Sequence, residues 1–278
     1  MNLSTPTAPF TDTKLVRSSL YATADRIEQR TSALHRAKIT GADAAATIAA
    51  LAAAAHPNPS RVADIGCGRG TTTIRLAHQY PAATIVAVDQ SPALLAVTGN
   101  RLRAQRREVT LVAADFHHLR GVLAHVDVAA AAFCLYHSRH PEKALAEIGA
   151  CLAPGAHLIA ATKSADSYIN IDRVIAASGL DREAVSRPSL YEAFHTSNAE
   201  AALAAAGFIL RRRVDQQHTF RFTDLAHLAE YAVTSPKYRL PSKLTADPAA
   251  LAAALRARLS DEPITAASTV TYLVATRP

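Results

Sequence analysis

Cysteine is scarce in this sequence, and no apolar run is long enough to cross a membrane. The 278 residues include three cysteines, Cys67, Cys134 and Cys151, which lie far apart and form no CxxC pair. This odd number and wide spacing exclude a disulfide framework and a zinc ribbon, and they favour a reducing, cytoplasmic location. The apolar stretch Ala44–Ala55 is shorter than the roughly 20 residues that a membrane span requires, so we expect no membrane partner.

A secretory signal is also lacking. The first residues are polar, and no basic segment leads into an apolar run, so residues 1–13 are expected to form a flexible tail. The formal net charge is +7, and basic residues are densest at 101–107 and 211–213. The first group is spread around a predicted helix and the second lies in a predicted strand near an edge. We therefore interpret both as solvated faces and expect no nucleic-acid partner.

What the sequence does contain is an alternation of apolar runs and helical patterns. Hydrophobic residues make up 49% and charged residues 19%, as in an ordinary globular protein. The expected strands are 62–66, 84–90, 109–115, 126–135, 157–164, 208–222 and 269–277. The expected helices are 14–34, a second from 41, 71–80, 91–107, 141–152, 168–191 in part, 197–206, 223–232 and 248–259. Apolar strands alternating with helices indicate a parallel sheet covered on both faces, so we predict a doubly wound, seven-stranded α/β fold.

Helical segments flank this predicted core. We expect an N-terminal helical lid over 14–58, a ligand-binding core over 59–165, a mostly helical substrate cap over 166–262 that is interleaved with the sixth strand, and a final core strand within 263–278. Eight of the fifteen aromatic residues lie in the cap: Tyr168, Tyr191, Phe194, Phe208, Phe220, Phe222, Tyr231 and Tyr238. A cap rich in rings suits a flat, apolar organic substrate. The alternative is that several rings, Phe208 and Phe220 above all, pack the cap's own core.

An acidic, glycine-rich turn follows the first predicted strand. Asp64, Gly66, Gly68 and Gly70 form the pattern DxGxGxG. Glycines permit a sharp turn and the close approach of a ligand, and the next helix offers its amino-terminal amides. Nicotinamide and flavin enzymes use the spacing GxGxxG for a diphosphate, whereas this spacing and the preceding acid suit a ligand that bears an ammonium group.

Two further carboxylates end the next two predicted strands. Asp89 ends the second strand, in a position to bind two ribose hydroxyls, and Asp115 ends the third, in a position to bind an adenine amino group. In sheets of this type, ligands bind outside the carboxyl ends of the strands. The three acids therefore predict one nucleoside-containing ligand at this edge of the sheet.

The segment from about 60 to 165 resembles class I S-adenosylmethionine (SAM) dependent methyltransferases. Four stretches carry the resemblance: VADIGCGRGTTTIRLA, IVAVDQSPALL, LVAADFHHL and LIAATKS. The resemblance implies the Rossmann-like fold of that family, SAM as cofactor and S-adenosylhomocysteine (SAH) as product. The cofactor-binding residues that it implies are Asp64, Gly66, Cys67, Gly68, Gly70, Thr71, Asp89, Gln90, Asp115, Phe116 and Phe133.

The stretch FCLYHSRHPEKALAEIGACLAPGAHLIAAT resembles a narrower branch of small-molecule methyltransferases, in which a LYH signature ends the fourth strand. Ala132 and Phe133 stand where that branch usually has polar residues. Together with the aromatic cap, the resemblance implies an apolar or aromatic acceptor in secondary metabolism. Among such enzymes, the chain is similar to those that methylate carbon in prenylated indole alkaloids of the teleocidin type.

Methyl transfer from a sulfonium is a direct displacement, so catalysis consists mainly of holding the acceptor in line. An oxygen or nitrogen acceptor also needs a base, and the candidates are Tyr21 in the N-terminal helix, His137 after the fourth strand and His195 in the cap. With an alkene acceptor, attack on the methyl group leaves a carbocation, which a ring such as that of Tyr21 could stabilise.

No metal is expected, because His137 and His140 lack further ligands nearby in the sequence. His117 and His118 are interpreted as a surface turn. An RNA or protein methyltransferase is supported only by the basic charge, since the Asn/Asp-Pro-Pro-aromatic and Pro-Cys motifs of such enzymes are missing. A non-catalytic SAM-binding protein stays open, because fold alone never determines function. Homo-oligomerisation through the N-terminal helices stays open as well.

Overall fold

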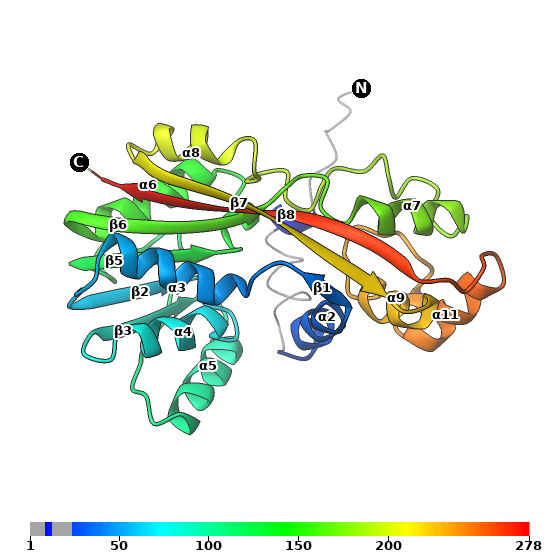
Figure 1. Cartoon of the computed structure of the whole chain (residues 1–278), viewed down its shortest axis with the longest axis horizontal. Helices are drawn as coiled ribbons and strands as arrows, with labels where there is room; N and C mark the ends of the chain where they lie inside the picture. Colours follow the sequence, from blue (N-terminus) through cyan, green and yellow to red (C-terminus); the bar gives the residue numbers. More distant parts are fainter. Residues whose placement is uncertain (1–8, 13–23, 278) are drawn as a thin grey trace. The chain divides into compact units, whose positions relative to one another are not determined.

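The computed structural model describes residues 9–12 and 24–277, whose helices and strands are drawn in Figure 1. The chain divides into two compact units. Of the described residues, the larger unit takes 42–163, 193–215 and 270–277, and the smaller unit takes 9–12, 24–41, 164–192 and 216–269. Segments far apart in the sequence therefore build each unit.

The strands form one eight-stranded sheet with the order β1-β7-β8-β6-β5-β2-β3-β4. Their bounds are β1 Lys38–Thr40, β2 Arg61–Ile65, β3 Thr84–Asp89, β4 Thr110–Ala113, β5 Val126–Ala132, β6 Leu152–Lys163, β7 Ile209–Phe222 and β8 Ile264–Thr276. Strands β6, β5, β2, β3 and β4 run parallel to one another, whereas β8 is antiparallel to β6. The carboxyl ends of the five parallel strands therefore lie at one edge of the sheet.

The helices of the larger unit are α3 Ala44–Ala55, α4 Thr71–Gln79, α5 Pro92–Ala104, α6 Pro141–Cys151 and α8 Ala199–Ala205, with the 3-10 turn η3 Leu135–His137. Those of the smaller unit are α2 Ala24–Ala37, α7 Ile169–Ala177, α9 Leu225–Ala232, α10 Ser242–Thr245 and α11 Pro248–Arg256, with the 3-10 turn η1 Pro9–Thr11. Among the described residues, no helix combines the length and the hydropathy that a membrane span requires.

The predicted doubly wound α/β fold is confirmed, with one strand more than predicted. The additional strand, β1, has only three residues and pairs with Thr219 and Phe220 of β7. Its central residue, Ile39, is 59% exposed, so no alternation of buried and exposed residues marks it in the sequence.

Several predicted elements are shorter in the structure. The strand expected over 126–135 ends at Ala132, because Phe133 has a φ of +56° and interrupts the ladder. The helical segment expected within 168–191 reduces to α7, and residues 14–23 of the helix expected over 14–34 lie outside the described residues.

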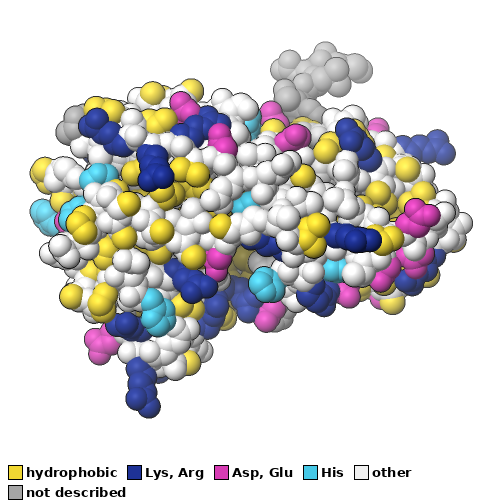
Figure 2. Space-filling model, viewed as in Figure 1, with side chains coloured by type: hydrophobic (Ala, Val, Ile, Leu, Met, Phe, Trp, Pro, Cys, Tyr) yellow, Lys and Arg dark blue, Asp and Glu magenta, His cyan; other side chains and the backbone are white. Residues whose placement is uncertain are grey.

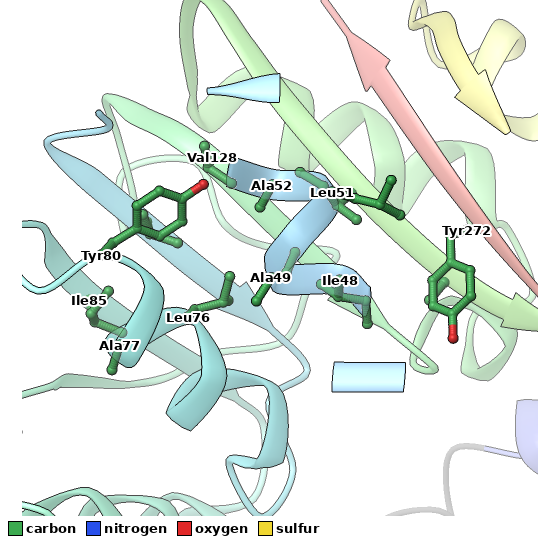
Figure 3. Close-up of a cluster of buried hydrophobic side chains, with 14 of the residues drawn as sticks. Ile48, Ala49, Leu51, Ala52, Leu76, Ala77, Tyr80, Ile85, Val128 and Tyr272 are labelled. Carbon is green, nitrogen blue, oxygen red and sulfur yellow. The ribbon is translucent and has the colours of Figure 1, made fainter. Parts of the chain in front are cut away.

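Alanine-rich α3 packs one face of the sheet in the larger unit. Asp43 caps the helix, since its Oδ1 accepts the N–H of Ala46 at 3.1 Å. Ile48 and Ala52 of α3 lie in a buried cluster with Val128 of β5 (Figure 3). Short alanine side chains are strong helix formers, and they let the helix approach the strands closely. This packing supports the strands whose carboxyl ends carry the candidate site.

Aromatic rings form much of the core of the smaller unit. The ring of Tyr231 lies 5.8 Å from that of Tyr168 and 5.7 Å from that of Phe222. The Arg30 guanidinium lies 4.8 Å from the centroid of Tyr231 and 5.7 Å from that of Phe10, and it donates a hydrogen bond to the Tyr231 hydroxyl at 3.0 Å. Stacked cation–π contacts of this kind hold α2, α9 and η1 together.

Basic side chains are spread over the visible face of the molecule, with acidic side chains among them (Figure 2). Within the run 211–213, Arg213 forms ion pairs with Glu200 and Asp215, and Arg211 donates a hydrogen bond to Thr276. Part of this run therefore contacts partners within the protein.

Candidate cofactor site

The glycine turn after β2 has the backbone geometry that its sequence predicts. Gly66, Gly68 and Gly70 have φ values of +67°, +56° and +75°, which side-chain-bearing residues rarely adopt. A Cβ on Gly66 would lie 2.6 Å from Cβ of Cys134, and one on Gly70 would lie 2.6 Å from Cγ2 of Thr98. These two positions therefore require glycine on both conformational and steric grounds.

Gly68 differs from its neighbours because it faces open space. No heavy atom of the described residues outside its chain neighbours lies within 4 Å of the position that its Cβ would occupy. Its carbonyl accepts a hydrogen bond from Thr98 Oγ1 at 2.9 Å, and its N–H donates to Oδ2 of Asp89 at 2.8 Å. Hydrogen bonds to Thr98 and Asp89 thus fix the backbone of Gly68, and the side of the turn toward which its Cβ would point stays accessible.

Asp64 is a buried carboxylate, and only one of its two oxygens has a hydrogen-bond partner among the described residues. Its Oδ2 accepts a hydrogen bond from Thr73 Oγ1 at 2.6 Å, whereas Oδ1 is buried and has no hydrogen-bond partner within the described ranges. Burial raises the pKa of Asp64 to about 7, and the nearby charge of Asp89 adds to the increase. A buried acceptor without a donor is destabilising, so this oxygen is suited to a cationic donor from a ligand.

Asp89 ends β3 and is oriented by the backbone. Its Oδ1 accepts the N–H of Ser91 at 2.9 Å, and Oδ2 accepts that of Gly68. Burial raises the pKa of this carboxyl, and the backbone hydrogen bonds oppose the increase. Gln90 follows immediately and is half-buried. The carboxylate is thus presented in one orientation at the carboxyl edge of the sheet.

Asp115 and Phe116 lie just beyond β4. Oδ1 of Asp115 accepts hydrogen bonds from the backbone N–H of His117 at 3.0 Å and from its Nδ1 at 2.8 Å. The ring of Phe116 lies 4.7 Å from that of His117. The two histidines follow β4 in a turn: His118 is exposed, and His117 is half-buried. The sequence did not indicate that the ring of His117 contacts both Asp115 and Ser138.

The end of β5 brings Phe133 and His137 to the same edge. The N–H of Phe133 donates to Ala161 of β6 at 2.9 Å, and Lys163 Nζ lies 5.7 Å from the centroid of its ring. Cys134 donates a weak hydrogen bond from Sγ to the carbonyl of Ile65. His137 ends η3, is half-buried, and lies 4.7 Å from the ring of Tyr136.

The two remaining predicted catalytic residues are Tyr21 and His195. Tyr21 lies outside the described residues. Residues next to His195 are bonded to the end of β6, since Thr162 Oγ1 donates to the carbonyl of Phe194 at 2.6 Å and the N–H of Thr196 donates to that of Lys163 at 3.1 Å. His195 itself accepts the N–H of Ser197 on Nδ1. The structure thus brings His137 and His195 to the carboxyl ends of neighbouring parallel strands.

Thr71 and Cys67 complete the set around the turn. Thr71 begins α4, and its hydroxyl accepts a hydrogen bond from Arg101 at 3.3 Å. Cys67 is buried, and burial, together with the charges of Asp64 and Asp89, raises the pKa of its thiol. A thiol with a raised pKa is a poor nucleophile, so Cys67 is suited to contact a ligand and not to react with it.

The central segment of this edge matches a known family. Residues 62–155 match the model described as a methyltransferase domain. This segment is therefore similar to methyltransferase domains. The demethylmenaquinone methyltransferase of Thermus thermophilus is 31% identical over 133 residues, which cover 48% of this chain and 60% of that protein. The chain therefore aligns with less than two thirds of this relative.

Solved structures agree with this similarity at the level of the fold. The 4+2 cyclase SpnF superposes with a TM-score of 0.61 at 18% identity. The alignment covers 99% of this chain and 98% of the SpnF chain. The plantazolicin methyltransferase BpumL, solved in complex with SAH, has a TM-score of 0.53 at 14% identity and covers 98% of this chain and 93% of its own. The fold thus extends over nearly the whole chain.

The residues at this edge of the sheet fit SAM as cofactor. Oδ1 of Asp64 is a buried acceptor that has no donor among the described residues, and the methionine part of SAM carries an ammonium group. The open side of Gly68 leaves room for a ligand against the backbone. Within the described part of the chain, no group of three or more His, Cys, Asp or Glu side chains is arranged to hold a metal ion.

Four polar residues that support this edge were missed in the sequence: Thr73, Thr98, His117 and Ser138. Thr73 lies one turn into the helix that follows the glycine motif, so its position could have indicated a contact with Asp64. Thr98 lies 30 residues from its partner Gly68 and Ser138 lies 21 residues from His117. No local pattern signals such contacts.

The aromatic residues of the predicted cap are all buried. Their exposure ranges from 0% to 8%: Tyr168, Tyr191, Phe194, Phe208, Phe220, Phe222, Tyr231 and Tyr238. Phe220 is buried in the smaller unit, which agrees with the expectation that it packs the cap's own core, whereas Phe208 belongs to the larger unit and lies against Gly149 of α6. The other six rings contribute to cores in the same way, so their number alone does not identify an acceptor site.

Proposed function

We propose that this chain is a SAM-dependent methyltransferase that binds its cofactor along the carboxyl ends of β2, β3, β4 and β5. One observation carries the proposal most directly. Among the described residues, the buried Oδ1 of Asp64, near the end of β2, has no partner, and the glycine-rich turn that follows has open space at Gly68. A carboxylate in such a position favours a cationic ligand group, because a charge-assisted hydrogen bond would satisfy the buried oxygen.

Each predicted residue has a role in this proposal. Asp64 would hold the amino group of SAM, Asp89 the ribose hydroxyls, and Asp115 with Phe116 the adenine. Gly66, Cys67, Gly68, Gly70 and Thr71 would form the turn around the methionine part, and Gln90 and Phe133 would flank the nucleoside and the methyl end. When bound, SAM supplies an electrophilic methyl group. The protein's contribution is to orient that group and to exclude water from it.

The proposed acceptor is an apolar or aromatic small molecule of secondary metabolism, with carbon of a prenylated indole alkaloid as the specific candidate. The name of the Thermus relative, a demethylmenaquinone methyltransferase, supports an acceptor of this apolar class. At an alkene carbon, a carbocation would form and lose a proton, and ring faces such as that of Tyr21 would stabilise it. At oxygen or nitrogen, His137, His195 or Tyr21 would remove the proton.

The proposed domain organisation follows from these roles. Residues 14–58 would act as a lid, 59–165 as the cofactor-binding core, 166–262 as the acceptor-binding cap and 263–278 as the last core strand. A cytoplasmic location, the absence of nucleic-acid and membrane partners, and an oligomer through the N-terminal helices are predictions that accompany this proposal.

Two measurements test the proposed function. Calorimetry with SAH tests cofactor binding, and we expect a single site per chain. Incubation of the protein with SAM and separate panels of prenylated indoles, quinols, phenols and amines, with detection of SAH and of the methylated acceptor, tests turnover. SAH binding without turnover on any acceptor would favour a non-catalytic role or another reaction, since the same fold occurs in a protein named a cyclase. Absence of SAH binding would contradict the proposal altogether.

A further inference from the structure

A hydrogen-bonded chain of three side chains connects two loops at the carboxyl edge of the sheet. His117 Nδ1 lies 2.8 Å from Oδ1 of Asp115, and its Nε2 lies 2.8 Å from Oγ of Ser138. Asp115 follows β4, and Ser138 follows the η3 turn after β5. The imidazole therefore joins the loop expected at the adenine to the turn that carries His137.

Both ends of this chain are anchored to the backbone. Oδ1 of Asp115 also accepts the backbone N–H of His117 at 3.0 Å. Oγ of Ser138 accepts the N–H of His140 at 2.9 Å, and the N–H of Ser138 donates to the carbonyl of Leu135 at 3.0 Å. With Nδ1 protonated, His117 can donate to the carboxylate while Nε2 accepts the serine hydroxyl. One neutral tautomer thus satisfies both ring nitrogens of His117.

The order of the three residues is the same as in Asp-His-Ser nucleophilic triads, but the serine is not presented for attack. Ser138 is 0% exposed, and its oxygen is already an acceptor for a backbone amide. A nucleophile must reach the substrate carbonyl at the surface of a site. His117 is 32% exposed and Asp115 is 26% exposed, so the accessible end of the chain is the carboxylate.

We propose that His117 is a positioning residue that holds the Asp115 carboxylate in the orientation needed to accept the amino group of adenine, with Ser138 as its anchor. The proposal rests on the proposed function, because it assigns adenine to Asp115. A carboxylate on a loop has freedom about two side-chain torsions, and a fixed imidazole removes that freedom. Preorganised acceptors discriminate strongly between a ligand that supplies the donor and one that lacks it.

The experiment compares SAH with S-inosylhomocysteine, in which an oxo group replaces the adenine amino group. Calorimetry measures the dissociation constants of both ligands for the full chain. We expect the wild-type protein to prefer SAH by roughly tenfold or more, the effect of one hydrogen bond to a charged group. His117→Ala should reduce that preference to near unity. Ser138→Ala should reduce it in part.

Two further variants separate positioning from a general loss of stability. In His117→Asn, the amide nitrogen occupies the place of Nδ1, so most of the preference should return. His118→Asn, at the exposed neighbouring position, should leave the preference at the wild-type value. Thermal unfolding of all variants measures the structural cost, which by itself does not change the ratio of the two dissociation constants.

The outcomes distinguish the two proposals. If the wild-type protein binds neither ligand, the proposed function fails. If it binds both but does not discriminate, or if His117→Ala keeps the full preference for SAH, the function stands and the positioning role of His117 is wrong. Loss of preference in His117→Ala with recovery in His117→Asn supports it.

Discussion

Oδ2 of Asp89 accepts the backbone N–H of Gly68 at 2.8 Å, which connects the end of β3 to the glycine turn after β2. The same carboxylate accepts the N–H of Ser91 on its other oxygen. This hydrogen bond holds the glycine turn and the carboxylate next to each other. The methionine and ribose parts of SAM would be bound by a single connected structure.

Replacement of Asp89 by alanine should abolish most SAH binding while the fold persists. The substitution removes a buried, hydrogen-bonded charge that would face the ribose, so we expect the affinity to fall by roughly 30-fold or more. Calorimetry measures the affinity, and far-ultraviolet circular dichroism checks the fold. Asp127→Ala is the matched control: Asp127 accepts two backbone N–H groups, those of Ser60 and Arg61, at the opposite edge of the sheet. An equal loss of affinity in both variants would show that the effect is structural.

Binding of SAH should weaken as the pH falls through the pKa of Asp64. Burial raises this pKa to about 7 from 3.8, so the carboxyl becomes neutral below that pH and loses its attraction for the ligand ammonium. We expect the affinity to decrease by up to about tenfold per pH unit below pH 7, measured by calorimetry between about pH 6 and about pH 8. Asp64→Asn should bind weakly and without this pH dependence. The same slope in Asp64→Asn would assign the titration to another group.

The stability of the ligand-free protein should change in the opposite direction. A folded-state pKa above the unfolded value means that the contribution of Asp64 to stability is fully present below 3.8 and is lost as the pH rises through about 7. Urea unfolding at a series of pH values should therefore show that the free energy of unfolding of Asp64→Asn increases relative to that of the wild-type protein as the pH rises. Bound SAH should reduce the loss of stability that the wild-type protein shows as the pH rises.

Alanine at Gly68 should affect binding more than folding. Gly68 and Gly121 both have positive φ and open space around a Cβ, so alanine at either position should cost about 1 kcal/mol of unfolding free energy. Only Gly68→Ala places a methyl group where the cofactor is expected, and it should lower SAH affinity by roughly tenfold or more. Gly66→Ala should cost at least about 2 kcal/mol, because its Cβ would overlap Cβ of Cys134. Normal SAH affinity in Gly68→Ala would contradict the proposed position of the ligand.

The buried pair of Asp172 and Lys237 should dominate the local stability of the smaller unit. Lys237 Nζ lies 2.5 Å from Oδ2 of Asp172, and the Tyr238 hydroxyl donates to Oδ1 at 2.8 Å. Burial raises the pKa of Asp172, and Lys237 opposes the increase. Lys237→Met leaves the carboxylate without its cation, so we expect a loss of about 3–5 kcal/mol in thermal or urea unfolding.

Two variants control for this prediction. Adding Asp172→Asn to Lys237→Met should recover most of the loss, because no buried charge remains. Arg256→Met breaks the ion pair between Arg256 and Asp261, whose side chains are 46% and 36% exposed, and should leave the unfolding midpoint almost unchanged because solvent screens this pair. A small effect of Lys237→Met alone would mean that water or a conformational change compensates the buried carboxylate.

The sequence by itself determined the parallel core and the edge at which a ligand would bind. Asp64, Asp89 and Asp115 each follow an apolar run, and carboxyl ends of parallel strands must meet at one edge, so their proximity follows from strand order and chain direction. The glycine positions follow from backbone conformation in the same way. These features are local, and period and spacing suffice to predict them.

Only the tertiary structure decided which side chains meet across that edge and which rings are buried. The bond between His117 and Ser138 joins residues 21 positions apart, and β1 is a strand only because β7 pairs with it. All eight rings of the predicted cap are buried, although their composition suggested a substrate surface. Such contacts depend on how separate segments pack, and packing is determined by the whole chain and not by any one segment of it.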